Sequence, residues 1–275
     1  MNQQHGKQRF ESDREAFLED MRGRNSLKAD RLFCSYDCTR FDFQAGIRRL
    51  LQKKGFHTAS DLGQLHTTIA SEKRDLDADQ LNEVSRSFYD TDNEFLSLYR
   101  RFIAEIIIPI FGQAIYFQAT PTIRFHFPRQ AGFDFLPTFH NDVMLGHPPQ
   151  EVNLWIPITK SFESNAMLLM GLDDSMSFLG DFAFDEFRKK TQTSAFNESL
   201  RAKSKAVTLD PGQFVAFDSR CIHATQYNET AATRISMDVR VIPVADYRGL
   251  HKNYIGTGRM RMPFAPGHYY AAEPA

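Results

Sequence analysis

Apolar residues in the first part of the chain recur with the period of a helix. A spacing of i, i+4, i+7 and i+8 links Phe43, Ile47, Leu50 and Leu51. This spacing predicts a helix with one apolar face. Asp42 can cap the start of that helix, and Gly55 can end it because glycine tolerates the left-handed backbone that closes many helices. A short helix is expected at 60–69, where Ser60 and Asp61 supply capping side chains.

Residues 77–110 also carry apolar side chains at helical spacing among their charges. They predict one long helix, or two helices that are interrupted around 90–93. Residues 1–9 are polar and are expected to be disordered, whereas 10–111 are helix-like throughout. An N-terminal helical region is therefore predicted at 1–111.

After residue 112 the pattern changes to short runs in which apolar and polar residues alternate, as they do in β-strands. Strands are expected at 114–118, 122–128, 152–158, 166–170, 175–179, 205–209 and 214–217, and a short helix at 182–191. Many short strands separated by turn signals predict a sandwich or barrel, and eight strands in two sheets form a jelly roll. The predicted fold class is α+β, with a double-stranded β-helix (jelly-roll or cupin-like) core at 112–249 and the N-terminal helices covering one sheet.

The tail, residues 250–275, is rich in glycine, proline and aromatic residues. It is expected to be either a lid over a site or a terminus wrapped around the core. A chain of 275 residues can bury a substantial core. The helical region, the strand-rich core and the tail are therefore expected to form one structural domain.

Charge is nearly balanced, with 33 Lys and Arg against 34 Asp and Glu. This balance gives no indication of nucleic acid or of an anionic membrane as a partner. No apolar run reaches the length of a membrane span, and the polar N-terminus lacks the apolar core of a signal peptide. The protein is expected to be cytoplasmic and to act on a small molecule.

The three cysteines are Cys34, Cys38 and Cys221. So small and odd a number fits a reducing compartment better than a disulfide scaffold. Cys34 and Cys38 are four residues apart, which suits one face of a helix, and they are expected to be structural thiols because no second pair with zinc spacing lies near them. Cys221 stands two residues before His223, and it is expected either to pack in the core or to point into the same cavity.

The candidate metal ligands are His140 and Asp142, separated by Asn141, and the distant His223. In an extended strand, His140 and Asp142 would project from one side and Asn141 from the other. His223 follows a Pro-Gly turn and the strand at 214–217, so it is expected to arrive from a different strand. Two imidazoles and one carboxylate form a three-ligand face that suits Fe(II) and leaves the opposite coordination positions open.

A strictly alternating run starts at Arg234 and places polar residues on one face, namely Arg234, Ser236, Asp238 and Arg240. A guanidinium grips a carboxylate through two parallel hydrogen bonds, and the hydroxyl of Ser236 can add a third. Beside a metal, this pair would hold a dicarboxylate cosubstrate. Together with the ligand set it predicts an iron(II) enzyme that uses 2-oxoglutarate and O2, with Asn153 as a further candidate for contact with 2-oxoglutarate.

The region from about Thr120 to Pro243 resembles the Fe(II)/2-oxoglutarate-dependent dioxygenases, especially their phytanoyl-CoA-hydroxylase-like branch. The resemblance is carried by His140-Asn141-Asp142, His223, Arg234-Ile235-Ser236 and the strand Glu151–Pro157. It covers somewhat under half of the chain, and the first hundred residues add no motif. It implies that the two histidines and Asp142 hold iron and that Arg234, supported by Ser236, pairs with the far carboxylate of 2-oxoglutarate. Halogenating relatives have a small residue where this chain has Asp142, so hydroxylation or a related oxidation is implied, with succinate and CO2 as products.

Candidate substrate residues are Arg124, His126, Arg129 and Arg240. Arg124 and His126 share one strand face, which is either an inner, substrate-facing surface or a solvated outer one. The arginines suggest a small polar or anionic substrate with a carboxylate or phosphate, such as an amino-acid derivative or a natural-product intermediate, hydroxylated at an unactivated C–H bond.

Two other functions remain open at this point. One is a cupin-type metal-dependent dioxygenase or isomerase without 2-oxoglutarate, although such sites usually carry more histidines and would leave Arg234 and Ser236 without a role. The other is a non-catalytic metal-binding sensor, because a fold does not prove a function.

Overall fold

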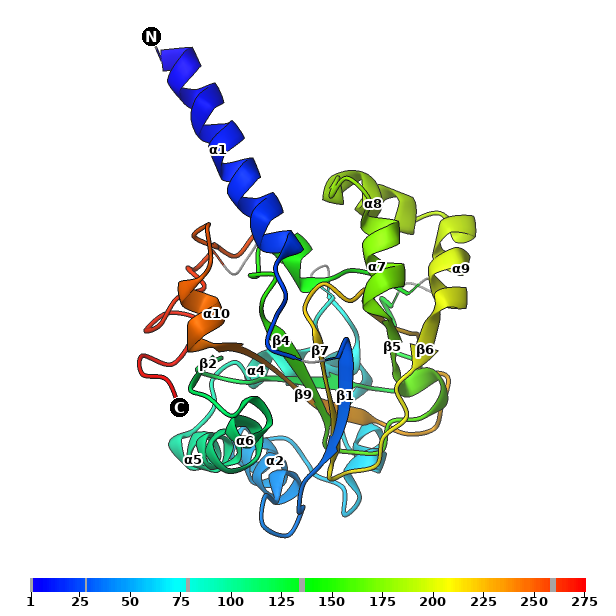
Figure 1. Ribbon diagram of the computed structural model, residues 1–275. Helices are drawn as coiled ribbons and strands as arrows, with labels where there is room; N and C mark the ends of the chain where they lie inside the picture. Colours follow the sequence, from blue (N-terminus) through cyan, green and yellow to red (C-terminus); the bar gives the residue numbers. More distant parts are fainter. Residues whose placement is uncertain (1, 28, 78–79, 134–136, 258–260) are drawn as a thin grey trace.

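Two antiparallel β-sheets form the centre of the protein (Figure 1). The computed structural model describes residues 2–27, 29–77, 80–133, 137–257 and 261–275. The larger sheet has the order β1-β7-β4-β9-β2, with β3 also paired to β9, and the smaller has the order β6-β5-β8. The strands are β1 Arg31–Ser35, β2 Ile115–Phe117, β3 Thr122–His126, β4 Val152–Pro157, β5 Met167–Met170, β6 Ser204–Ala206, β7 Gln213–Asp218, β8 His223–Thr225 and β9 Arg234–Pro243.

Helices surround the sheets, and α2, α5 and α6 lie together on one side of the larger sheet (Figure 1). The helices are α1 Asn2–Arg22, α2 Phe43–Lys53, α3 Ser71–Arg74, α4 Glu83–Ser87, α5 Asn93–Phe102, α6 Ile108–Phe111, α7 Leu172–Leu179, α8 Phe184–Thr191, α9 Ser194–Lys203 and α10 Val244–Arg248. Short segments of 3-10 helix are η1 Leu62–Thr67, η3 Asp142–Leu145 and η4 Glu163–Asn165, and η2 Ile103–Ile107 is a π-helical turn.

The side chains of strand β9 point alternately into the hydrophobic core and toward a cavity. Ile235, Met237, Val239 and Val241 are buried in the main hydrophobic core, where they pack with residues of α2, α4 and α5. The intervening residues face the other way, and Arg234, Asp238 and Arg240 line a cavity. The period-two pattern therefore predicts correctly which residues of β9 face the core, because side chains alternate across a strand.

The helix signals in the first half of the chain are largely confirmed. Asp42 caps α2 by accepting from the backbone N–H of Ala45 at 2.8 Å, and Gly55 follows that helix with φ of 79°. Asp61 caps η1 by accepting from Gly63 N–H. The region 77–110 is interrupted where expected, since α4 ends at residue 87 and α5 starts at residue 93.

Four local predictions are wrong. Helix α1 begins at Asn2, within the segment that was expected to be disordered. The helix-like region contains β1, which pairs with β7, so Cys34 lies on a strand rather than on a helix with Cys38. The segment 175–179, for which a strand is predicted, belongs to helix α7. Helix α9, which follows α8, is not predicted from the sequence. Helix α7 starts with two aspartates, which favour a helix N-terminus, and its buried residues are four positions apart.

The C-terminal tail packs against the larger sheet. Ala271 N–H donates to Phe117 at 2.9 Å, and Ile115 and Ala275 exchange two backbone hydrogen bonds. Tyr269 and Tyr270 are buried. These contacts favour the wrapped terminus over a free lid, although Thr257 reaches the edge of the cavity.

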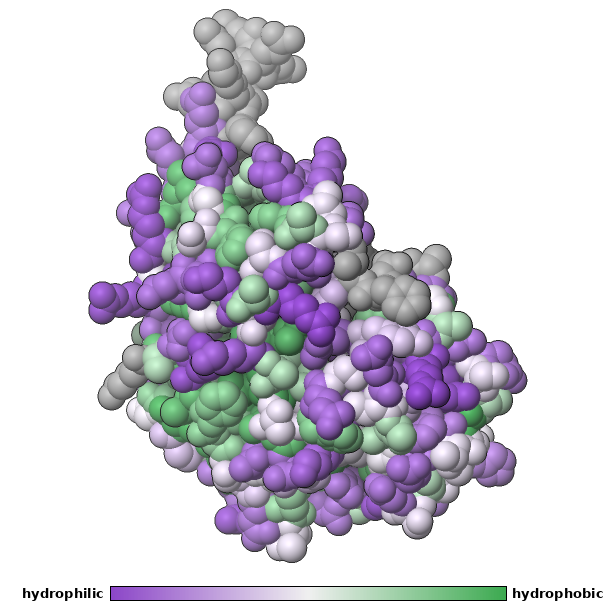
Figure 2. Space-filling model, turned by 90° about the vertical axis from the view of Figure 1, so that its right-hand side faces the viewer, coloured by the Kyte–Doolittle hydropathy of each residue, from purple (hydrophilic) through white to green (hydrophobic). Residues whose placement is uncertain are grey.

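The surface mixes polar and apolar residues. On the face shown in Figure 2, hydrophobic areas are separated by hydrophilic ones. In the part of the chain that the structure describes, no helix is both long enough and apolar enough to cross a membrane.

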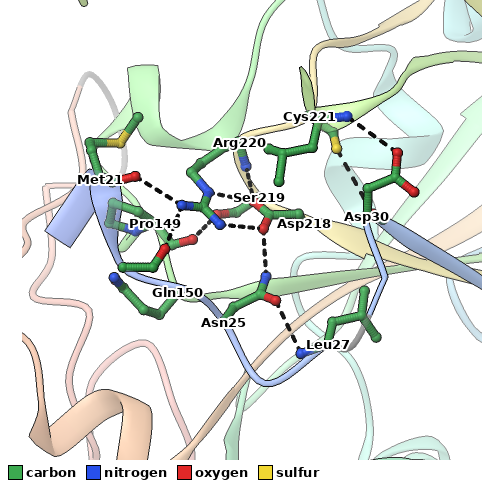
Figure 3. Close-up of polar contacts among 12 residues, drawn as sticks. Met21, Asn25, Leu27, Asp30, Pro149, Gln150, Asp218, Ser219, Arg220 and Cys221 are labelled. Atoms are coloured by element: carbon green, nitrogen blue, oxygen red, sulfur yellow. Dashed lines mark hydrogen bonds and ion pairs between the residues drawn. The ribbon is translucent and has the colours of Figure 1, made fainter. Parts of the chain in front are cut away.

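A buried ion pair attaches the N-terminal segment to the body (Figure 3). Arg220 donates to both carboxylate oxygens of Asp218, at 2.8 and 2.6 Å, and to the carbonyls of Met21 and Gly23 at 2.9 and 2.7 Å. Asn25 donates to the same carboxylate at 2.8 Å. Arg220 thus holds the C-terminal end of α1 against the chain that leads to His223.

Replacement of Arg220 by alanine is expected to lower the free energy of unfolding by about 3–5 kcal/mol, because a buried carboxylate and two carbonyls lose their partner. Urea denaturation measures this change. Lys190→Ala is the control, since its ion pair with Glu186 is more than half exposed and is expected to contribute little to stability. Equal denaturation midpoints for Arg220→Ala and the wild type would contradict the prediction.

Candidate active site

Three side chains that could hold a metal ion converge from distant parts of the sequence. His140, Asp142 and His223 each offer one ligand atom, and these atoms lie within 4.8 Å of one another. The two histidines are held by a pair of backbone hydrogen bonds, His140 N–H to His223 at 3.0 Å and His223 N–H to His140 at 2.8 Å. The approach of two strand-like segments thus brings the two imidazoles to one point, as expected for a ligand set that spans two strands.

The His-x-Asp segment is not one continuous strand, which corrects the sequence prediction. His140 forms an isolated β-bridge, and the chain turns into η3 at Asp142. Asn141 does point away from the ligands, because its side chain accepts from Met144 N–H and donates to the Arg220 carbonyl. This turn buries Asp142 completely.

Both imidazoles have the tautomer and the protonation state that metal binding requires. The Nδ1 atoms of His140 and His223 lie 3.0 Å from the carbonyls of Thr138 and Cys221, so Nδ1–H donates and Nε2 keeps its lone pair. Burial and the neighbouring His223 lower the pKa of His140 to about 4, although Asp142 opposes the shift. Burial also lowers the pKa of His223. At neutral pH both rings are uncharged and need not lose a proton to bind a metal.

Asp142 is ionised and has two unequal oxygens. Burial alone would raise the pKa of Asp142, but the charge of Arg240, with smaller effects of His147 and His223, holds it well below its usual range. Oδ2 accepts from Arg240 Nε at 2.9 Å. Oδ1 has no hydrogen-bond partner and lies 3.8 Å from His223 Nε2.

Arg234 is a buried cation without a carboxylate partner among the described residues. Its side chain lies over the ring of Trp155 at 5.3 Å, and Nη1 donates to Ser236 at 3.1 Å, whereas Nε has no partner. Burial lowers the pKa of Arg234 to about 10, so the group stays charged at neutral pH. Asn153 also lines the cavity, and neither atom of its buried amide has a partner.

Two of the four predicted substrate residues, Arg124 and Arg240, are among the described residues that line the cavity. Arg124 lines the cavity and donates to Asp238 at 2.7 Å, and Arg240 lines it while bound to Asp142. His126 is buried beside Arg234, to which it is paired across β3 and β9, and its ring lies near the backbone of Asn165 and Gln226. Arg129 is exposed and lies outside the described set of cavity-lining residues.

The cavity has a volume of about 760 Å³. One wall comes from α8 and the residue after it, through Arg188, Thr191 and Gln192, none of which the sequence pattern indicated. Arg188 lies in a run of three basic residues that is typical of a solvated helix end. Cys221 is not part of the described lining, because its Sγ lies near the Asp30 carbonyl at 3.9 Å (Figure 3).

The unpartnered buried atoms fit a metal and a dicarboxylate. Asp142 Oδ1 and two imidazole nitrogens form a nitrogen and oxygen donor set that suits Fe(II). The buried guanidinium of Arg234 lacks an anion, and buried polar groups are normally paired. The fold and this site define a non-haem Fe(II)- and 2-oxoglutarate-dependent dioxygenase.

Comparison with protein families agrees with this class. Residues 41–236 match the phytanoyl-CoA dioxygenase (PhyH) family, and the chain belongs to that family. The match starts well before Thr120, so it includes helical segments in which no motif was recognised from the sequence. A metalloenzyme without 2-oxoglutarate is accordingly not supported.

Two similar proteins add detail. The streptomycin biosynthesis protein StrG of Streptomyces griseus is 25% identical over 195 residues, which are 70% of this chain and 78% of that protein. The crystal structure of SnoK, a non-haem α-ketoglutarate-dependent carbocyclase from nogalamycin biosynthesis, superposes with a TM-score of 0.52 at 13% identity. That superposition covers 92% of this chain and 95% of SnoK, and at this identity it shows a shared fold.

Proposed function

We propose that His140, Asp142 and His223 bind Fe(II) and that Arg234 holds the far carboxylate of 2-oxoglutarate, with support from Ser236. The observation that carries this proposal is the buried guanidinium of Arg234, which has no acidic partner among the described residues and lines the same cavity as His140 and His223. Asn153 is assigned to the same cosubstrate because its buried amide is unpartnered. The two antiparallel sheets are proposed to form a double-stranded β-helix.

When bound, iron with 2-oxoglutarate and O2 supplies oxidation of a substrate C–H bond, with succinate and CO2 as products. The protein's own groups provide position and charge. The carbonyls of Thr138 and Cys221 orient the imidazoles, and Arg234 orients the cosubstrate by its far end. Asp142, His223 and Arg234 are buried, so water has little access to these groups.

The substrate is proposed to be a small anionic metabolite that is hydroxylated. Three of the four guanidinium groups among the described lining residues have an acidic partner in the protein or in the proposed cosubstrate. The pairs are Arg124 with Asp238, Arg240 with Asp142, and Arg234 with 2-oxoglutarate. Arg188, the fourth, has no hydrogen-bond or ion-pair partner in the described part of the chain, so it is free to bind a carboxylate or phosphate.

The relationship to StrG favours a natural-product intermediate, because that relative is described as a streptomycin biosynthesis protein. An amino-acid derivative would meet the same charge requirement. The cavity volume of about 760 Å³ has room for a molecule of either kind.

The proposal is tested by incubating the iron-loaded protein and 2-oxoglutarate with matched sets of carboxylates, phosphate esters and neutral analogues. Succinate formation is expected to rise with an anionic set, and mass spectrometry is expected to find one added oxygen atom in the product. Stimulation by the neutral set alone would contradict an anionic substrate. A product that has lost two hydrogens would replace hydroxylation by desaturation or ring formation.

Arg188→Ala is expected to raise the KM for the stimulating anion roughly tenfold, because a charge-assisted hydrogen bond is lost. Succinate formation without substrate is expected to be unchanged. Lys190→Ala is the matched control on the same helix, since Lys190 pairs with Glu186 and is outside the described cavity lining. An unchanged KM in Arg188→Ala would move the anion site elsewhere.

A further inference from the structure

Arg240 makes the two oxygens of Asp142 different. The Nε–H group donates to Oδ2 at 2.9 Å, and Oδ1 is left without a hydrogen bond. Oδ1 lies 3.8 Å from Nε2 of His223, on the side of the other proposed ligands. The Asp142 side chain is fully buried and that of Arg240 is 13% exposed, so water competes little with this contact.

We propose that Arg240 is a positioning residue that restricts Asp142 to binding the metal through one oxygen. A carboxylate can bind a metal through one oxygen or through two. Two-oxygen binding would take a coordination position that a three-ligand face must leave open for cosubstrate and O2. The donor on Oδ2 opposes that option, because it occupies one of the two lone pairs of Oδ2 and makes this oxygen a weaker metal ligand than Oδ1. This inference rests on the proposed metal ligands.

The sheet holds Arg240 in place. It lies on β9 between two neighbours, since its carbonyl accepts from Gln118 N–H at 2.8 Å and its Cα is paired with Asn153 of β4. Burial would lower the pKa of Arg240, but the charge of Asp142 raises it above its ordinary value, so the donor stays protonated. A guanidinium fixed on a central strand is suited to orient a metal ligand, as partners of ligands do in other metal sites.

Arg124 offers a matched comparison in the same cavity. It also donates through Nε to a carboxylate, that of Asp238, at 2.7 Å. Its side chain is 45% exposed, and Asp238 is not one of the grouped metal-binding residues. Arg124→Met therefore removes the same kind of ion pair without touching a proposed ligand.

The test uses Co(II) as a probe of coordination in the full-length protein. Arg240→Met is expected to weaken Co(II) binding about 10- to 100-fold. It is also expected to change the visible Co(II) spectrum and to weaken 2-oxoglutarate binding to the Co(II)-loaded protein. Arg124→Met is expected to retain the wild-type Co(II) affinity and spectrum. Arg240→Lys keeps the charge but not the planar Nε–H, so it is expected to recover metal affinity without recovering the spectrum or the 2-oxoglutarate affinity.

A wild-type Co(II) spectrum together with wild-type 2-oxoglutarate affinity in Arg240→Met would overturn the inference. If that variant does not fold, the same result in Arg240→Lys overturns it. Asp142→Ala distinguishes an error in the proposed metal site from an error in the role of Arg240. Wild-type Co(II) binding in Asp142→Ala would reject the metal site itself, whereas its loss there combined with wild-type behaviour of Arg240→Met rejects only the role of Arg240.

Discussion

Asp142→Ala is expected to reduce iron binding and succinate formation by roughly a thousandfold or more. The change removes the one negative charge of the proposed ligand set. It also leaves the guanidinium of Arg240 buried beside the cation site without its partner at 2.9 Å, so a stabilising charge is replaced by a repelling one. Iron content after anaerobic loading and succinate formation at saturating 2-oxoglutarate measure the two effects.

Asp238→Ala is the control for this experiment. Asp238 lines the cavity that His140 and His223 also line, and it carries the same charge as Asp142, but its partner is Arg124. The variant is expected to bind one iron per chain, as the wild type does. Undiminished decarboxylation of 2-oxoglutarate by Asp142→Ala would refute the assignment of Asp142 as a ligand.

Arg234→Met is expected to have opposite effects on stability and on cosubstrate binding. Without 2-oxoglutarate, the buried charge of Arg234 has no acidic partner in the described structure, so its replacement by an apolar side chain of similar length should stabilise the protein by on the order of 1–4 kcal/mol. With 2-oxoglutarate, loss of a buried charge pair costs about 2–5 kcal/mol. The dissociation constant should therefore rise about 30-fold to several thousandfold.

Thermal denaturation with and without 2-oxoglutarate, in the presence of Ni(II), measures both effects in one experiment. Arg124→Met is the control. The guanidinium of Arg124 is already paired with Asp238, so this variant should leave the stabilisation by 2-oxoglutarate intact. A variant Arg234→Met that binds 2-oxoglutarate as the wild type does would place the cosubstrate's anchor on another residue.

Features that depend on neighbouring residues can be predicted from the sequence, whereas features that depend on distant contacts cannot. The alternation along β9 predicts which face carries Arg234, Ser236, Asp238 and Arg240, because strand geometry fixes that face without reference to the rest of the chain. Capping by Asp42 and Asp61 is equally local and was predicted correctly. The strand β1 was missed because two adjacent residues, Leu32 and Phe33, are both exposed on it and give no alternating pattern.

The residue types of the proposed site and their order are visible in the sequence alone, and they predict a three-ligand iron site with a cation for a dicarboxylate. Which of these charges are paired depends on contacts between segments that are distant in the sequence. Arg240, Arg124 and Arg188 look alike in the sequence, yet the first pairs with Asp142 and the second with Asp238. The third lines the cavity, and its guanidinium has no partner among the described residues. The reason is that an ion pair requires two groups within a few ångströms, and that distance is set by strand pairing and packing between segments far apart in the chain.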